Sequence, residues 1–211
     1  MYVAHRARVS DAFDIGTPVA IPTGWSTAQG ASLSADGKRL ILVGDPEQYK
    51  LGEMTRVTRD AAFAGDVDES AFASVNQSST YTGKIYAYPV VSARDDQLYF
   101  NSAYPDAGST VVVSTRDADG VWLAPTQLSG VVLDGAVGKR RLPTGVSSDE
   151  RTLFYFNEET AHEEARFRDT SQQSSPLYDM ITLGTRRGAI PNLACDRLYS
   201  ESNSDVVVEQ D

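Results

Sequence analysis

Basic residues gather at two places in this 211-residue chain, although the chain as a whole is acidic. It carries 19 Lys and Arg against 29 Asp and Glu, a formal net charge of −10. The two basic clusters are Lys139-Arg140-Arg141 and Arg186-Arg187. An arginine guanidinium forms paired hydrogen bonds with a carboxylate or a phosphate, so these clusters predict a site for a small anion or an acidic peptide end. The alternative is that these arginines pair with the chain's own carboxylates.

The densest group of metal-capable side chains lies at 158–164. If this stretch is helical, Glu158, Glu159 and His162 share one face, because residues three and four apart are neighbours on a helix. The chain has 2 His and 1 Cys (Cys195), so no second segment completes a transition-metal site. We therefore expect a solvated acidic face, with no metal and no cofactor. A shifted pKa of His162 would instead favour an enzyme.

Recurring aspartates are candidates for the paired carboxylates of glycoside hydrolysis. They are Asp36, Asp95 or Asp96, Asp149 and Asp196. Each lies in a turn of a repeated phrase, where an Asp side chain accepts hydrogen bonds from the backbone that follows. Because repeat positions are spread around a fold, we expect these carboxylates to be structural. The sequence has no G-x-S-x-G nucleophile motif, so it identifies no catalytic residue.

The phrase that holds these aspartates occurs four times, and each copy reads as a β-hairpin. The copies start at Gly30, Pro89, Pro143 and Pro191, and their second strands start near Leu40, Leu98, Leu153 and Leu198. A second phrase runs from an arginine through a polar turn to an aromatic residue. It occurs as Arg6 to Phe13, Arg56 to Phe63 and Arg116 to Trp122. Together the two phrases supply four antiparallel strands, which is the pattern of a β-propeller blade.

The two phrases, P-x-x-S-x-D-x-x-x-L-Y-F and R-D-x-D-G-x-W-x-x-P, resemble the WD-repeat-like propeller repeat of TolB-type bacterial proteins. The resemblance covers nearly the whole chain. It implies a β-propeller, a non-catalytic binding role, and a periplasmic or extracellular place in the cell envelope. It says little about activity, because propellers host many unrelated functions.

We predict one all-β domain over 1–211, a propeller of four-stranded antiparallel blades, four in number. The last blade is expected to be a composite of 189–211 and 1–22, which removes the open sheet edges. Five blades, or a piece of a larger propeller, are the alternatives.

The loops that lead into the innermost strands of a propeller surround one mouth of its central channel. Both basic clusters lie in such loops, and the matching loops of the first two copies carry aromatic residues. The predicted function is a ligand- or protein-binding module at this mouth, and a hydrolase or lyase acting there on a sugar or small anion is the alternative. A structural piece of a longer exported protein is the third possibility. The expected site residues are Arg140, Arg141, Arg186, Arg187, Trp25, Tyr86, Tyr88 and His162.

Charge and hydropathy exclude two classes of protein. No apolar run approaches the roughly 18 residues of a membrane span, so we expect no integral membrane segment. The negative net charge argues against a nucleic-acid binder. No secretory signal peptide is visible after Met1, so the sequence leaves the compartment open.

Overall fold

The computed structural model describes most of the chain up to 168 and shorter stretches after it. The described residues are 2–3, 16–21, 25, 30–44, 50–78, 85–103, 109–128, 141–158, 160–168, 177–184, 187–191, 198–202 and 205–209. For residues 2–3, 17, 85–86, 103, 109–110 and all those from 162 onward, the description covers the backbone alone. Of the residues named from the sequence, these lie outside it: Arg6, Phe13, Lys139, Arg140, Glu159, Arg186, Cys195 and Asp196.

The described strands form antiparallel sheets, of which four follow one another along the chain. Sheet I contains β3 (Ala31–Leu33), β4 (Arg39–Gly44) and β5 (Lys50–Thr55). Sheet II contains β6 (Ile85–Val91), β7 (Gln97–Ala103), β8 (Ser109–Thr115) and β9 (Thr126–Gln127). Sheet III contains β10 (Arg141–Val146), β11 (Thr152–Asn157), β12 (His162–Arg168) and β13 (Leu177–Gly184). Sheet IV contains β14 (Arg187–Pro191), β15 (Leu198–Ser202) and β16 (Asp205–Glu209).

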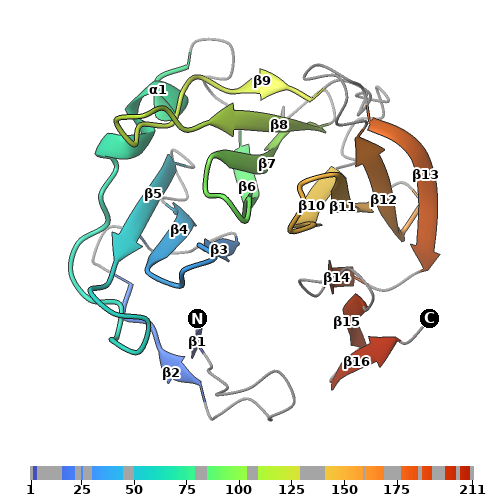
Figure 1. The fold of residues 1–211 in the computed structure, drawn as a ribbon, viewed down its shortest axis with the longest axis horizontal. Coiled ribbons are helices and arrows are strands. Elements are labelled where there is room, and N and C mark those ends of the chain that lie inside the picture. Colours follow the sequence, from blue (N-terminus) through green and yellow to red (C-terminus); the bar gives the residue numbers. More distant parts are fainter. Residues whose placement is uncertain are drawn as a thin grey trace.

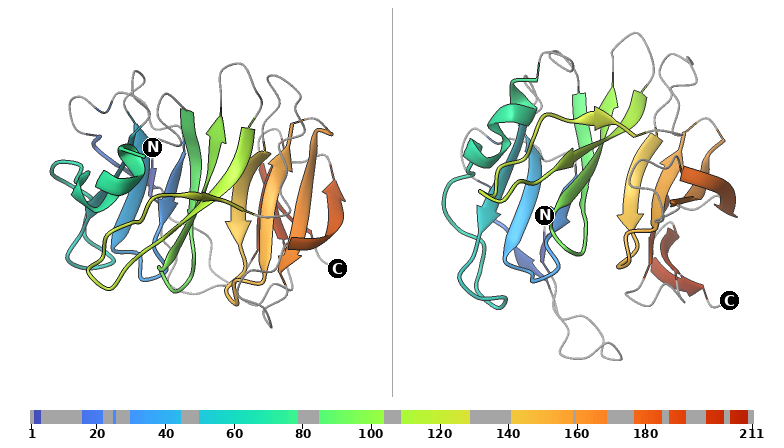
Figure 2. Two further views of the ribbon diagram at one scale, coloured as in Figure 1. Left: turned by 90° about the horizontal axis from the view of Figure 1, so that it is seen from above. Right: turned by 45° about the horizontal axis from the view of Figure 1, so that its top comes forward.

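The four sheets stand around a common centre like propeller blades (Figures 1 and 2). The first strand of each sheet, β3, β6, β10 or β14, lies innermost, and consecutive inner strands contact one another. Among the described strands the ring of sheets is not closed, because β1 (Tyr2–Val3) and β2 (Thr17–Pro18) pair only with each other. The all-β fold with antiparallel sheets is therefore confirmed, whereas the number of blades and the composite last blade stay predictions.

Alternate residues of the strands form the cores between neighbouring sheets, as the two-residue period of a strand requires. Between sheets I and II, Ile41 and Val43 of β4 pack against Phe100 and Trp122. Between sheets II and III, Tyr99 and Val111 pack in one cluster with Leu153 of β11. Sheet II thus buries both of its faces, one against sheet I and the other against sheet III.

A segment before β3 covers the other face of sheet I. Val19, Ile21 and Trp25 pack there with apolar side chains of sheet I and of the following loop: Leu40, Leu42, Met54, Phe63 and Val67. Gly44 and Gly52 leave the space for the Trp25 ring, since a Cβ atom on Gly44 would lie 2.1 Å from Trp25 Cε3. This segment takes the place that a neighbouring sheet takes on sheet II.

The second repeated phrase forms the same contact in two sheets. The Arg56 guanidinium lies 4.5 Å from the centre of the Phe63 ring, and that of Arg116 lies 5.7 Å from the Trp122 ring. In addition, the Arg56 backbone N–H donates to the Lys38 carbonyl in the hairpin of sheet I. The Arg116 backbone N–H donates to the Asp96 carbonyl at the equivalent place in the hairpin of sheet II. The arginine therefore ties the third strand of each sheet to the hairpin turn beside it.

One stretch differs from the expectation. The helix considered for 158–164 does not form over 162–164, because β12 is hydrogen-bonded to β11 on one side and to β13 on the other, and these ladders outweigh the helix propensity of glutamate. Between β5 and β6, the described residues contain a 3₁₀ turn (Ser70–Phe72) and helix α1 (Ala73–Asn76). No helix in the described part of the chain is long and apolar enough to cross a membrane.

Candidate functional site

The starts of the inner strands bring two of the expected arginines to one end of the sheets. Arg141 is the first residue of β10, and Arg187 is the first residue of β14. Because β10 contacts both β6 and β14, these strand starts are neighbours around the centre. We refer to this end, where β6, β10 and β14 begin, as the entrance mouth.

The strand register places further expected residues at the same level. Tyr86 pairs with Ser102 in sheet II, and Arg141 holds the matching position opposite Asn157 in sheet III. Asn157 in turn pairs with His162, so a single row crosses three strands of sheet III from Arg141 to His162. With strands about 4.8 Å apart, His162 lies roughly 10 Å from Arg141 along this row.

The backbone of Arg141 is anchored by a buried amide. Asn101 Nδ2, on β7 of the neighbouring sheet, donates to the Arg141 carbonyl at 2.7 Å, and the Asn101 side chain is fully buried. Arg141 itself is half-buried. Sequence reasoning missed Asn101, although a polar residue directly after the apolar run Leu-Tyr-Phe was a signal.

Tyr88 lies in a β-bulge of the inner strand β6. Between the paired residues Ala87 and Val90, two residues oppose one on β7, and Tyr88 has a φ of 55°. A bulky side chain rarely adopts this left-handed conformation. Gly30, the residue at the same position before β3, has a φ of 104°, and a Cβ atom added to it would lie 3.0 Å from Tyr88 Cα.

The ring of Trp25 is packed in the core of sheet I. Its side chain is 9% exposed, which leaves little surface for a ligand. The structure thus brings the backbones of Tyr86, Tyr88, Arg141 and Arg187 to neighbouring inner strands, while Trp25 supports sheet I.

The opposite ends of the inner strands carry the hairpin turns, and there the repeated serine and aspartate bond to each other. Ser34 Oγ donates to Asp36 Oδ1 at 2.6 Å and accepts the Arg39 N–H at 2.9 Å. Ser147 and Asp149 form the same hydroxyl–carboxylate contact at 2.6 Å. The structural role expected for the repeated aspartates is therefore confirmed for Asp36 and Asp149, whereas Asp196 lies outside the described residues.

These hydrogen bonds also hold the turn carboxyls in their ionised form. The Ser34 hydroxyl, helped by the Lys38 N–H, holds the pKa of Asp36 below its ordinary value. The Ser147 hydroxyl likewise lowers the pKa of Asp149, against the opposing effect of partial burial. Both carboxylates are thus hydrogen-bond acceptors at neutral pH.

The turn of sheet II departs from this pattern. Arg94 stands where the other two turns have Asp36 and Asp149, and Asp96 accepts the Ser92 hydroxyl instead, at 2.9 Å. This change leaves the Arg94 side chain free to reach the next sheet.

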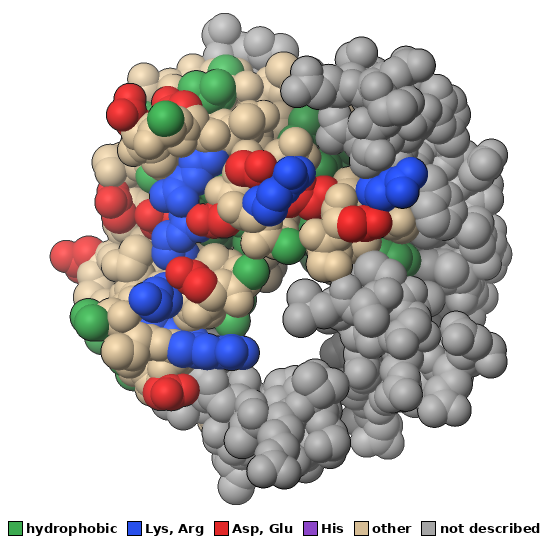
Figure 3. Space-filling view, in the orientation of Figure 1, with side chains coloured by type: hydrophobic (Ala, Val, Ile, Leu, Met, Phe, Trp, Pro, Cys, Tyr) green, Lys and Arg blue, Asp and Glu red, His purple; other side chains and the backbone are tan. Residues whose placement is uncertain are grey.

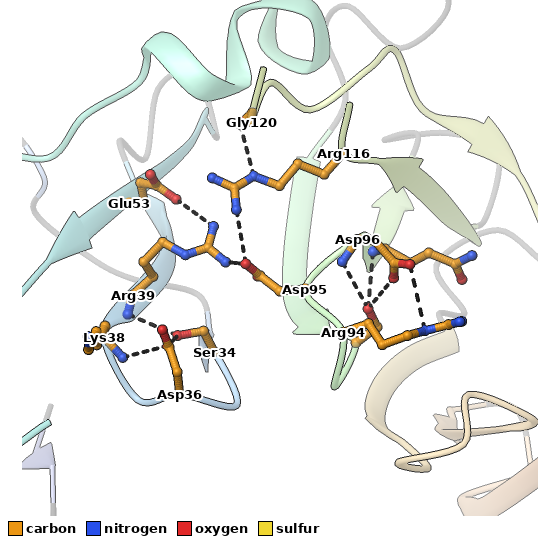
Figure 4. A network of polar contacts seen from close by, with 12 residues as sticks. Ser34, Asp36, Lys38, Arg39, Glu53, Arg94, Asp95, Asp96, Arg116 and Gly120 are labelled. Atoms are coloured by element: carbon orange, nitrogen blue, oxygen red, sulfur yellow. Dashed lines mark hydrogen bonds and ion pairs between the residues drawn. The ribbon is translucent and has the colours of Figure 1, made fainter. Parts of the chain in front are cut away.

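Carboxylates at the left-handed position of the turns connect neighbouring sheets. Asp95 of sheet II, with a φ of 65°, pairs with Arg39 of sheet I and accepts Arg116 Nη1 at 2.9 Å (Figure 4). Glu150 of sheet III, with a φ of 59°, binds Arg94 of sheet II through Nε at 3.0 Å and through Nη2.

Further charges complete this surface. Arg39 Nη1 lies 3.6 Å from Glu53 Oε2, an ion pair longer than a hydrogen bond. Figure 3 shows the alternating basic and acidic side chains across the face that carries the hairpin turns. We call this surface the hairpin face; Arg39, Arg94 and Arg116 pair there with Glu53, Asp95 and Glu150, within and between sheets.

The described residues hold no group of three or more His, Cys, Asp and Glu that could bind a metal ion.

No protein-family model matches the chain, and no curated protein matches it. Several solved structures, in contrast, are similar to the chain. The periplasmic gluconolactonase PpgL of Pseudomonas aeruginosa is 13% identical with a TM-score of 0.54, over 99% of this chain and 62% of that one. TolB of Acinetobacter baumannii is 7% identical with a TM-score of 0.51, over 86% of this chain and 40% of that one. The chain thus spans less than two thirds of either protein, and it has a TolB-like β-propeller fold.

Proposed function

We propose that this chain is a ligand-binding β-propeller module whose site is the entrance mouth. The observation that carries the proposal is that Arg141 and Arg187 begin adjacent inner strands, in a protein with a net charge of −10. Arginines at the starts of neighbouring strands favour an anionic ligand, because a guanidinium forms paired, charge-assisted hydrogen bonds with a carboxylate.

The ligand class follows from the neighbours of these arginines. Tyr86 and His162 lie at the same row level as Arg141, and this combination of aromatic and basic residues suits a small molecule or peptide end that joins a carboxylate to an apolar part. The buried amide of Asn101 fixes the backbone at Arg141, so the site is supported before any ligand arrives.

None of the described carboxyl groups with a shifted pKa is suited to act as a general acid. Those whose pKa is shifted, Asp36, Asp68, Asp149 and Glu150, all have a lowered pKa. A general acid needs the opposite shift, toward neutral pH. Three of the four belong to hairpin turns, at the far end of the inner strands.

The experiment is a calorimetric titration of the purified chain with citrate and with a short peptide that ends in two aspartates. Arg141→Ala is expected to weaken binding roughly tenfold or more, the value of one charge-assisted hydrogen bond. Arg151→Ala is the matched control, since it removes an exposed arginine from the hairpin face. Equal weakening by both variants would mean unspecific charge attraction, and no weakening by Arg141→Ala would overturn the proposal.

A second candidate function is hydrolysis of a sugar lactone at the same mouth. The likeness to the gluconolactonase PpgL, which extends over 99% of this chain, favours testing it. Opening of a lactone releases a proton, so a pH-stat assay with glucono-δ-lactone measures the reaction directly. If the protein hydrolyses the lactone faster than buffer alone does, and Arg141→Ala reduces that rate, the chain is an enzyme and the binding-module proposal is replaced.

A further inference from the structure

A tyrosine at the bulge of β6 is a feature that the fold does not require. The same bulge occurs in β14, where Gly188 stands at the position of Tyr88 between the paired residues Arg187 and Ile190. In front of β3 the position is Gly30, which also has a positive φ. Glycine adopts such a conformation at no steric cost, whereas a tyrosine is strained in it.

Strain of this kind persists where the side chain serves a function. Tyr88 is half-buried. It lies two residues beyond Tyr86, the residue of β6 that matches Arg141, and β6 contacts β10. Two residues of strand correspond to roughly 7 Å, a distance that one small molecule spans.

We infer that Tyr88 is the ring on which the ligand of the entrance mouth rests, and that the ligand joins a carboxylate to a flat apolar group. The guanidinium of Arg141 binds the carboxylate, and the Tyr88 ring stacks on the flat group. This inference rests on the proposed function and narrows its ligand to aromatic carboxylates or peptide ends with an aromatic last residue.

Two probes separate the ring from the charge: benzoate, a carboxylate with a flat ring, and acetate, the same carboxylate without it. Titrations followed by nuclear magnetic resonance detect the weak binding expected of such small molecules. The unsubstituted protein is expected to bind benzoate about five- to tenfold more tightly than acetate, the usual effect of one aromatic pair. Arg141→Ala should weaken both probes alike.

Three variants at position 88 test the ring and its backbone. Tyr88→Phe should keep the preference for benzoate, while Tyr88→Ala and Tyr88→Gly should abolish it and leave acetate binding unchanged. Because both variants lack the ring, the difference between their melting temperatures measures the backbone strain alone. Tyr88→Gly should therefore melt about 2–4 °C above Tyr88→Ala.

The outcomes keep this inference apart from the proposed function. If acetate and benzoate both bind and Arg141→Ala weakens them, but Tyr88→Gly leaves their ratio unchanged, Tyr88 is structural and only this inference fails. If the unsubstituted protein binds neither probe nor citrate, both the inference and the proposed function are overturned. A loss of the benzoate preference in a well-folded Tyr88→Gly variant supports the inference.

Discussion

Replacement of Gly44 by alanine tests whether the Trp25 ring lies where the structure has it. An added Cβ atom would lie 2.1 Å from Trp25 Cε3, whereas ordinary contacts begin at 3.4 Å, so the ring must move by more than an ångström. Overpacking of this kind costs about 1–3 kcal/mol. Alanine has less conformational freedom than glycine in the unfolded chain, and this difference stabilises the folded variant by roughly 0.5–1 kcal/mol. We therefore expect Gly44→Ala to lower the free energy of unfolding by about 1–2 kcal/mol.

The Trp25→Ala background separates this clash from any other effect. Trp25→Ala alone should cost about 3 kcal/mol, near the lower end for a buried tryptophan. Once the ring is gone, Gly44→Ala has no clash left and should be neutral or stabilising by about 0.5 kcal/mol. The coupling energy between the two positions is then about 1.5–2.5 kcal/mol, within the range measured for residues in contact.

Urea unfolding followed by far-UV circular dichroism measures each free energy, and the fluorescence of the buried Trp122 gives a second probe. Gly52→Ala is the matched control: its Cβ atom would lie 2.4 Å from Val67 Cγ1 as well as 2.8 Å from Trp25 Cη2. It should therefore remain destabilising in the Trp25→Ala background. An equal cost of Gly44→Ala in both backgrounds would refute the placement of Trp25 over sheet I.

Two further predictions concern the hairpin face. Asp95→Asn removes the charge that two arginines share and should lower the free energy of unfolding by about 2–3 kcal/mol. In the double variant Arg39→Leu/Asp95→Asn, much of that free energy should be recovered, as measured by urea unfolding. If the double variant is as unstable as Asp95→Asn alone, the pairing of Arg39 with Asp95 is contradicted. Burial raises the pKa of Glu150, but hydrogen bonds from Arg94 outweigh it and leave the pKa lowered. The stability that Glu150 contributes is thus complete above its unfolded-state pKa of about 4.3, and it is lost as the pH falls through the lower folded value. Glu150→Gln should flatten the unfolding curve against pH below about pH 4.5, and an unaltered slope would show that Glu150 is not the group involved.

The hairpin turns could be predicted from the sequence because their hydrogen bonds are local. Ser34 bonds to Asp36 two residues away, and to the N–H of Arg39 five residues away. A pattern that recurs at such short range gives the strands on both sides and hence the sheets. The arginine-to-aromatic phrase is equally local, as Arg56 and Phe63 show.

Contacts between distant segments could not be predicted in the same way. Nothing near Trp25 indicates that its ring packs over Gly44 and Gly52, because the space is made by residues of two other strands. The Asn101 contact to Arg141 likewise joins residues of two sheets. The strand at 162–168 shows the same limit, since its glutamates favour a helix until two neighbouring strands supply the ladders.

The ion pairs that join neighbouring sheets on the hairpin face have a consequence for the order in which the protein forms. Arg39 precedes Asp95 along the chain, and Arg94 precedes Glu150, so each carboxylate belongs to the later sheet and its arginine to the earlier one. Gly37 holds the matching position of sheet I and carries no such carboxylate. During synthesis from the N-terminus, the arginine of each pair has therefore already been synthesised when the hairpin that carries the carboxylate leaves the ribosome. The sheets can be added in the order of translation, and none of these pairs has to wait for a residue that has not yet been synthesised.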